Sequence, residues 1–371
     1  MPHTIPTNRS DIEWRTESTQ KPPKQAVYIQ EAAAAEILKN AHAQTATVWT
    51  GDFHNAKQVL AAIKKRIRRP SEKKKDAPAD IQTAFHAHRM KQAQQSRLLN
   101  MLAVEIQPNF KLDNARAPDI YAALYDVYAT PHDKPFLLPL NQLLGFIGAH
   151  EWHKKGIDIP QLDGKIHVPF GVFSPLRGEY LDLIAQAPLA PNIQTAFDIG
   201  TGSGVIAAIL AKRGIPDIIA TDTNPKAIAC ATATLERLGL DKAVNIQSID
   251  LFPESCADLI VCNPPWLPAK PTSAIETALY DPNHAMLTAF LNGVPHHLNP
   301  NGEAWLIISD LAEHLHLRDK DFLNQCFQTA SLNVVDILKT KPQHKKAIDE
   351  SDPLAFARNK ETTYLYRLKA I

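Results

Sequence analysis

Short apolar runs alternate with helix-forming segments from Thr195 to near the end of the chain, and this alternation most constrains the fold. The segments after most of these runs predict helices. Buried strands are expected at 195–200, 217–222, 244–248, 258–263 and 303–309, with two later ones at 332–338 and 363–368. Because helices that join parallel strands cover both faces of a sheet, the pattern predicts an α/β domain with a mainly parallel sheet.

The preceding residues show other patterns, and a chain of 371 residues exceeds the size at which single cores stop growing. Residues 1–25 are polar and proline-containing, which predicts a mobile N-terminal arm. Residues 26–160 are expected to form a mainly α-helical domain for substrate recognition. Its helices are expected at 31–42, 55–69, 81–104, 118–128 and 137–150. A Gly- and Pro-punctuated stretch places the boundary near residue 160, so that 161–371 form the α/β domain.

Composition narrows the remaining possibilities. The formal net charge of +1 predicts no general affinity for polyanions, so any basic surface must be local. The chain shows no signal-peptide pattern and no apolar run of membrane-spanning length, and a cytoplasmic location without a membrane partner is therefore expected. The cysteines lack CxxC spacing and are expected to be reduced thiols. Close histidine pairs, including His150 and His153, lack a third ligand at a recognisable spacing, so no metal site is expected.

A glycine-rich turn follows the first strand. Asp198 ends that strand, and Gly200, Thr201, Gly202 and Gly204 lead into an apolar helix. Glycines in such a turn let the backbone approach a ligand closely. A dinucleotide fingerprint has its third glycine three residues after the second, and the spacing here departs from that. The turn therefore favours a mononucleoside-like cofactor over NAD.

Acidic residues follow the next two strands. Asp222 ends the second strand, where its carboxylate can accept both hydroxyls of a ribose. Asp250 and Leu251 follow the third strand, where they can meet an adenine edge and ring. Since open α/β sheets bind ligands at the carboxyl ends of their strands, these residues and the glycine turn are expected to form one cofactor site.

The fourth strand ends in Asn263, Pro264, Pro265 and Trp266. The consecutive prolines hold the backbone extended and present the Pro264 carbonyl, and Asn263 adds a side-chain carbonyl. These two acceptors suit the two hydrogens of one –NH2 group, while Trp266 offers a flat face to a planar substrate. The four residues are thus expected to carry the reaction, which would be methylation of an amide or exocyclic amine nitrogen.

These motifs, in this order over about residues 165–310, resemble the class I methyltransferases of the small-domain superfamily. That superfamily includes release-factor glutamine methyltransferases and enzymes that methylate adenine or guanine amino groups in rRNA, tRNA and DNA. The resemblance implies a Rossmann-like sheet of seven strands with its last strand antiparallel. It also implies S-adenosyl-L-methionine as the cofactor.

The resemblance assigns roles to residues. The three glycines would form the cofactor loop, Asp222 would bind the ribose, Asp250 would read the adenine, and Asn263 with Pro264 would clamp the target amine. The segment 172–180 resembles the stretch that precedes the first motif in glutamine methyltransferases. It departs from their Arg-Pro-Glu-Thr-Glu pattern, so Arg177 and Glu179 receive no role.

A basic run, KKRIRRPSEKKK, spans Lys64–Lys75 with Glu72 as its single acid. It is either a solvated helix end or a contact for RNA phosphates or an acidic protein surface. These basic residues favour a macromolecular acceptor, a base in rRNA, tRNA or DNA before a protein glutamine. A non-catalytic cofactor-binding or assembly module is the alternative of a different class, and the intact amine clamp disfavours it. The sequence leaves the oligomeric state open.

Overall fold

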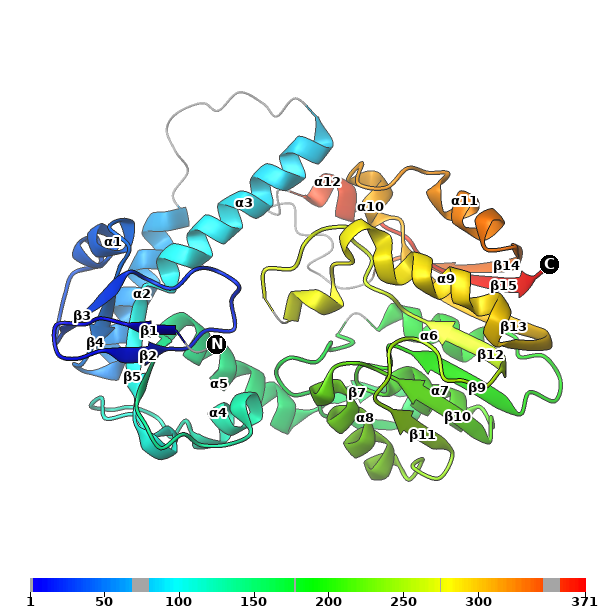
Figure 1. The fold of residues 1–371 in the computed structure, drawn as a ribbon, viewed down its shortest axis with the longest axis horizontal. Coiled ribbons are helices and arrows are strands. Elements are labelled where there is room, and N and C mark those ends of the chain that lie inside the picture. The colour runs from blue at the N-terminus through cyan, green and yellow to red at the C-terminus, as the bar shows by residue number, and fades with distance from the viewer. Residues whose placement is uncertain (1–2, 69–79, 177, 274, 343–353) are drawn as a thin grey trace. The chain divides into compact units, whose positions relative to one another are not determined.

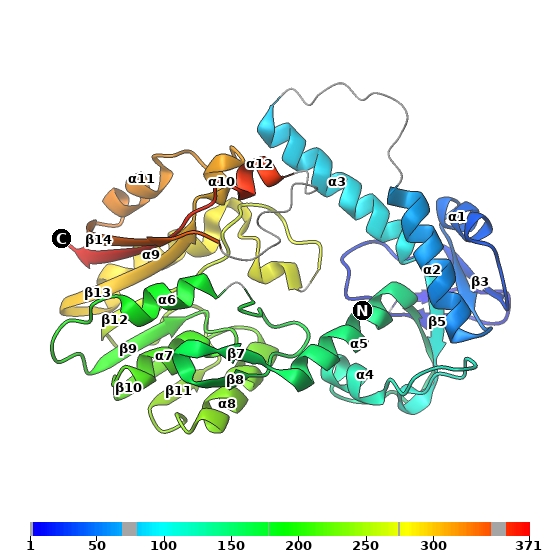
Figure 2. The same cartoon turned by 180° about the vertical axis from the view of Figure 1, so that it is seen from behind.

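A computed structural model describes residues 3–68, 80–176, 178–273, 275–342 and 354–371 (Figure 1; Figure 2). By their contacts the residues form two units. Unit 1 comprises Met1–Glu151 with Thr272–Ala274, and unit 2 comprises Trp152–Pro271 with Ile275–Ile371. No helix among the described residues is both long enough and apolar enough to cross a membrane. The domain boundary near residue 160 and the roles given to the domains remain predictions.

Unit 1 contains a six-stranded sheet with the order β1-β2-β6-β5-β4-β3. Its strands are β1 (His3–Ile5), β2 (Ile12–Trp14), β3 (Gln25–Ile29), β4 (Thr45–Trp49), β5 (Leu102–Ile106) and β6 (Phe136–Pro139). Strands β3, β4 and β5 are parallel to one another, and β6 is antiparallel to β5. Every residue of β4 is buried, as expected for a parallel strand covered on both faces.

Helices α1 to α4 lie between these strands in the chain, and α5 follows β6. The helices are α1 (Ala34–His42), α2 (Phe53–Arg68), α3 (Ile81–Leu99), α4 (Tyr121–Tyr128) and α5 (Leu140–Lys155), and the 3-10 turn η1 (Pro108–Phe110) precedes α4. The 3-10 turn η2 (Pro160–Leu162) belongs to unit 2. Helix α1 joins β3 to β4, and α2 with α3 joins β4 to β5. Both connections are βαβ crossovers, which parallel strands require.

The sheet corrects the expectation of a mainly α-helical unit. The predicted helix 81–104 ends at Leu99 and gives way to β5, and the predicted helix 137–150 begins as β6. In both places a short buried strand adjoins a helix with almost no turn residues between them. Apolar periodicity alone does not distinguish a short buried strand from a helix segment.

The N-terminal segment corrects a second expectation. Instead of a mobile arm, residues 3–14 supply two strands, and β2 pairs with β6 in parallel. Ile5, Ile12 and Trp14 are buried in the same apolar cluster as Val48 and Leu137. Most residues around these three are polar, so the average polarity of the segment does not indicate that the three are buried.

Unit 2 contains the predicted seven-stranded sheet, with the order β11-β10-β9-β12-β13-β15-β14. Its strands are β9 (Thr195–Ile199), β10 (Asp217–Thr221), β11 (Val244–Gln247), β12 (Ala257–Cys262), β13 (Leu298–Ser309), β14 (Leu332–Thr340) and β15 (Thr363–Ala370). Strands β9 to β13 are parallel, and β15 lies antiparallel between β13 and β14. A hairpin of β7 (Ile157–Ile159) and β8 (Gly164–Ile166) precedes the sheet.

Helices cover both faces of this sheet, which confirms the expected α/β architecture (Figure 1). The helices are α6 (Glu179–Gln186), α7 (Val205–Lys212), α8 (Pro225–Leu238), α9 (Ala285–His297), α10 (Leu311–His314), α11 (Phe322–Thr329) and α12 (Ala355–Arg358), and the 3-10 turns are η3 (Ile275–Ala278) and η4 (Pro282–His284). Helices α6, α7 and α8 share one apolar cluster, and α9 and α11 share another.

The direction of connection reverses between β9 and β12. From β9 the chain moves outward to β10 and β11, whereas β12 lies on the other side of β9. In an open α/β sheet the loops after two such strands diverge and leave a crevice at their carboxyl ends. The fold therefore places a binding site beside the loops that follow β9 and β12.

Candidate functional site

A cavity of about 590 Å³ lies at this position in unit 2. Most of the predicted site residues line it: Gly200, Thr201, Gly202, Asp222, Asp250, Leu251, Asn263, Pro264, Pro265 and Trp266. The segments after β9, β10, β11 and β12 thus meet around one space. Its size is within the range of small-molecule sites in proteins.

The glycine turn is built by backbone geometry that only glycine adopts readily. Gly200, Gly202 and Gly204 have φ values of 72°, 57° and 78°. A Cβ on Gly204 would lie 3.0 Å from the Cα of Ala231 on α8, so this glycine serves close packing of the helix. Gly204 itself does not line the cavity, whereas Gly202 does.

Asp198 lies under the turn rather than in the cavity wall. Its side chain is fully buried, and its Oδ2 accepts hydrogen bonds from the Thr201 hydroxyl at 2.6 Å and the Ala207 backbone N–H at 3.0 Å. Its Oδ1 has no hydrogen-bond partner among the described residues. Burial raises the pKa of Asp198 to about 7, against these two hydrogen bonds, and the nearby Asp222 carboxylate adds to the rise.

Asp222 connects the turn to the next strand. Its Oδ2 accepts the Gly202 N–H at 2.9 Å, and its Oδ1 accepts the Asn224 N–H at 2.9 Å. Each carboxylate oxygen can accept a second hydrogen bond, so two acceptor positions remain for a ligand. The two backbone N–H groups hold the Asp222 side chain in place where it lines the cavity.

The third segment presents Asp250 and Leu251 to the cavity, together with Ile249. Asp250 is exposed, while Leu251 is half-buried and has a φ of 54°. The Leu251 carbonyl accepts the Thr221 hydroxyl at 2.7 Å, which fixes this bend to the end of β10. An apolar side chain next to a carboxylate suits a flat heterocycle with polar edges.

Asn263 is held by Trp266 and lies beside Tyr180. The Trp266 indole N–H donates to Asn263 Oδ1 at 2.9 Å. The buried phenol of Tyr180 lies beside Asn263, which works to lower the pKa of that phenol against a larger rise from burial. One lone pair of Oδ1 then remains for a ligand.

Cys262 ends β12 directly before the clamp and is completely buried. Burial raises the pKa of its thiol well above the ordinary value. The sulfur is therefore a protonated, apolar part of the sheet rather than a nucleophile.

Several lining residues carry no recognisable sequence signal. Tyr180 and Phe173 come from the segment before β9, which resembles a family motif only in part, and Glu179 from the same segment is not a lining residue. Other lining residues come from distant segments: Thr277, Ala278, Leu279, Tyr280, Met286, Leu311, Arg358 and Glu361. Arg177 lies outside the described residues.

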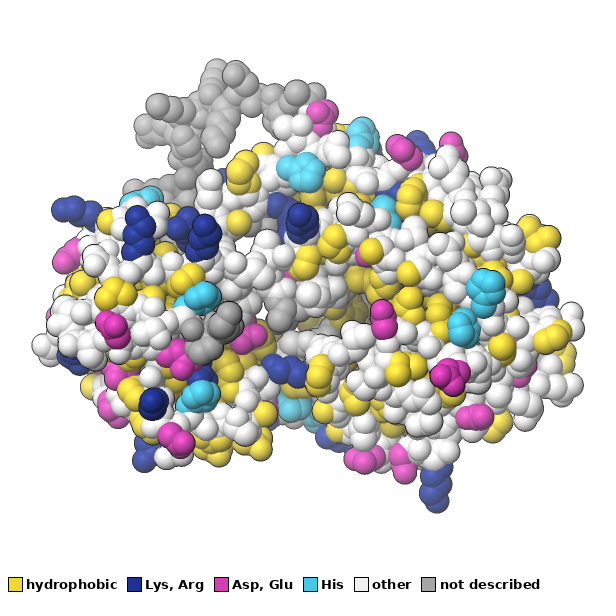
Figure 3. Space-filling model, viewed as in Figure 1, with side chains coloured by type: hydrophobic (Ala, Val, Ile, Leu, Met, Phe, Trp, Pro, Cys, Tyr) yellow, Lys and Arg dark blue, Asp and Glu magenta, His cyan; other side chains and the backbone are white. Residues whose placement is uncertain are grey.

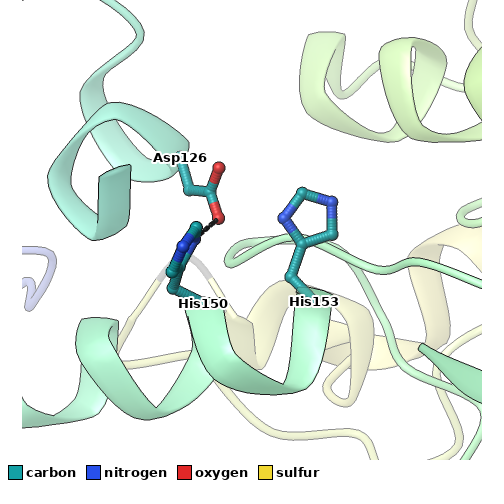
Figure 4. Close-up of side chains that lie close together, drawn as sticks. All are labelled: Asp126, His150 and His153. Atoms are coloured by element: carbon teal, nitrogen blue, oxygen red, sulfur yellow. Dashed lines mark hydrogen bonds and ion pairs between the residues drawn. The ribbon is translucent and has the colours of Figure 1, made fainter. Parts of the chain in front are cut away.

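A histidine pair gains a neighbour that the sequence did not reveal. His150 on α5 pairs with Asp126 on α4, with 2.7 Å between Nδ1 and Oδ2, and His153 follows one turn later on α5 (Figure 4). Their possible ligand atoms lie within 4.8 Å of one another. Since Asp126 comes from another helix, the search for a third ligand by sequence spacing missed it. The existing hydrogen bond accounts for the Asp126–His150 pair without an ion.

Part of the basic run is described. Lys64, Lys65, Arg66 and Arg68 lie on the last turns of α2, and residues 69–79 fall outside the described residues.

Comparison with known proteins agrees with the geometry of unit 2. Residues 165–336 match the family model described as methyltransferase small domain. The chain is 35% identical over 140 residues to a release factor glutamine methyltransferase of Cereibacter sphaeroides. The aligned region covers 34% of this chain and 50% of that protein. The chain is 34% identical over 134 residues to a tRNA1(Val) (adenine(37)-N6)-methyltransferase of Cytophaga hutchinsonii, covering 34% and 56%.

The chain therefore spans about half the length of these curated relatives. Among solved structures, a ribosomal protein L11 methylase from Lactobacillus delbrueckii subsp. bulgaricus matches with a TM-score of 0.38 and 17% identity. That match covers 54% of this chain and 81% of the other.

Proposed function

Because residues 165–336 carry a methyltransferase small domain, we propose that this chain transfers a methyl group from S-adenosylmethionine to a planar amino or amide nitrogen. One observation carries the proposal. A single cavity joins the glycine turn and Asp222 to Asn263 and Pro264, so a methyl donor and a nitrogen acceptor can meet there.

The residues on the donor side fit this cofactor. Asp222 would accept its ribose hydroxyls, and Asp250 with Leu251 would contact its adenine. The donor carries positive charge, and the Asp222 carboxylate lies at the turn, while the buried Asp198 below it keeps one oxygen without a partner among the described residues. Bound S-adenosylmethionine supplies an electrophilic methyl group. A Cβ added to Gly202 would have no atom closer than 4.0 Å, so there is room for a ligand beside this glycine.

The acceptor side fits a weakly nucleophilic nitrogen. The lone pair of an amide or aromatic amine is delocalised, so the nitrogen must become more tetrahedral and more positive as it attacks. The free lone pair of Asn263 Oδ1 and the Pro264 carbonyl would accept its two hydrogens and stabilise that charge. Trp266 would stack on the planar group, which gives binding before the reaction.

A base in rRNA, tRNA or DNA is the preferred acceptor, because unit 1 carries a local excess of positive charge on α2 and α3. A protein glutamine is the second candidate. It is favoured by the 35% identity to a release factor glutamine methyltransferase, whereas the tRNA methyltransferase at 34% identity favours the first. A non-catalytic binding module has no use for an oriented amide and carbonyl beside the donor site.

Calorimetric titration tests the donor half of the proposal. The wild type is expected to bind S-adenosylmethionine and not NAD, and Asp222→Ala is expected to weaken binding about tenfold or more. A hydrogen bond to a charged acceptor is worth about 1.5–3 kcal/mol, so the loss of even one of the two corresponds to about tenfold or more. Lack of S-adenosylmethionine binding by the wild type, or tight NAD binding, would overturn the proposal.

A further inference from the structure

Helices α2 and α3 of unit 1 carry positive charge without any compensating acid of their own. Neither helix contains Asp or Glu. Their basic residues are Lys57, Lys64, Lys65, Arg66 and Arg68 on α2, and Arg89, Lys91 and Arg97 on α3. The two helices pack against each other, and Lys and Arg side chains gather over the region where they lie (Figure 3).

A groove of about 250 Å³ follows the contact between these helices. Lys64 and Arg68, four residues apart on α2, lie on one side. Gln92, Gln95 and Ser96 of α3 lie on the other, and Asn141 of α5 also contributes. The polar side chains that line it thus offer two cationic groups, three amides and a hydroxyl, and none of them is a carboxylate.

Among the residues that the structure describes, no carboxylate forms an ion pair with either cation of the groove, Lys64 or Arg68. Burial, and then the charge of Arg68, lower the pKa of Lys64 from its ordinary value. The negative charge of an anion in the groove would raise the pKa of Lys64 again and would offset the repulsion between the two cations.

We infer that this groove binds phosphate groups of a nucleic-acid backbone, an inference that rests on the proposed function and names where its substrate docks. Arg68 can grip a phosphate through two N–H groups, and Lys64 adds a point charge. Amides and hydroxyls commonly complete phosphate contacts. Helix α3 has 19 residues, so it extends about 28 Å at 1.5 Å per residue. A nucleic-acid backbone carries regularly spaced negative charges along its length. It therefore suits a helix of this length without Asp or Glu better than a single acidic side chain does.

Fluorescence anisotropy with a labelled single-stranded RNA of mixed sequence tests the inference. For Lys64→Ala/Arg68→Ala, affinity should fall roughly tenfold at low salt. The slope of log K against log salt should become shallower by about 1.4, since each lost phosphate contact removes about 0.7 for single strands. The matched control is Lys111→Ala/Lys134→Ala, which removes two exposed lysines of unit 1 outside these helices. It should change affinity and slope much less.

Gln95→Ala separates a built site from diffuse charge. Gln95 Nε2 contacts the Ile67 carbonyl at 3.4 Å, and the amide faces the groove without carrying charge. Its loss should weaken RNA binding about two- to tenfold, as for a neutral hydrogen bond, with the salt slope unchanged. A circular dichroism melt of each variant shows whether unit 1 is still folded.

Three results would overturn the inference. Equal losses in the groove and control variants would mean that total charge, not the groove, binds RNA. Absence of RNA binding by the wild type at low salt would remove it altogether, as would preference for an acidic polyglutamate peptide over RNA. The calorimetric titration with S-adenosylmethionine is repeated on the same preparation. Binding of S-adenosylmethionine without binding of RNA would contradict the groove and leave the proposed methyl transfer standing.

Discussion

The Trp266 indole nitrogen fixes the side chain on which the proposed reaction depends. Trp266→Phe keeps an aromatic face but removes the N–H that donates to Asn263 Oδ1. We expect kcat to fall about three- to tenfold, the worth of one neutral hydrogen bond, with KM and cofactor affinity nearly unchanged. Trp266→Ala should in addition raise KM, because stacking is lost. Single-turnover and steady-state rates with the methyl-accepting fraction measure this.

Tyr180→Phe is the companion variant, since it removes the phenol oxygen that lies beside Asn263. It should lower kcat to a similar extent. If both variants keep the wild-type kcat, Asn263 needs no orientation by its aromatic neighbours.

Asp198 predicts a pH dependence of stability. Its folded pKa is raised to about 7 by burial, whereas the ordinary value is 3.8. Between about pH 4 and pH 7 the unfolded chain has lost this proton and the folded chain retains it. Unfolding therefore releases a proton, and the free energy of unfolding falls as pH rises through this window. Above about pH 7 the contribution is lost and the effect levels off.

Asp198→Asn keeps the shape of the protonated acid and cannot titrate. Urea unfolding of both proteins, without added cofactor, should show the wild type losing stability relative to the variant from about pH 4 to pH 7. A difference that stays constant across this range would contradict a raised pKa for Asp198.

At the scale of elements, two glycines of one turn should fail in different ways. Gly204→Ala sets a Cβ 3.0 Å from the Ala231 backbone at a φ of 78°, so it should lower the free energy of unfolding by about 2 kcal/mol or more. Gly202→Ala meets nothing nearer than 4.0 Å but lines the cavity, so its main effect should be weaker cofactor binding. Denaturation and calorimetry on both variants compare the two. A larger loss of unfolding free energy in Gly202→Ala than in Gly204→Ala would contradict this prediction.

The elements of unit 2 could be predicted because each apolar run ends in a residue with a specific role. Strand β9 ends before a glycine turn, β10 before Asp222, and β12 before Asn263. The strands of unit 1 lack such endings. Strand β6 leads straight into α5, and its four buried residues look like the first turn of that helix.

At the scale of the whole chain, sequence reasoning reached the residues that follow strands and missed those brought in by tertiary structure. Tyr180 has no motif of its own, yet it lines the cavity beside Asn263. Arg358 and Glu361 lie about a hundred residues beyond the clamp and still line the cavity, because β15 returns beside β13. Asp126 reaches His150 in the same way. Such contacts depend on packing, which local pattern does not encode.

The most direct test of the central claim is transfer of label from methyl-labelled S-adenosylmethionine to cell extract, with wild type and Asn263→Ala compared. We expect label in the macromolecular fraction, removed by nuclease rather than protease. Asn263→Ala should lower the rate on the order of 100- to 1000-fold, as for loss of one preorganised polar group, while cofactor affinity stays nearly unchanged. Protease-sensitive label would move the acceptor to protein. Transfer by Asn263→Ala within about threefold of the wild type would contradict methylation of a nitrogen held by this clamp.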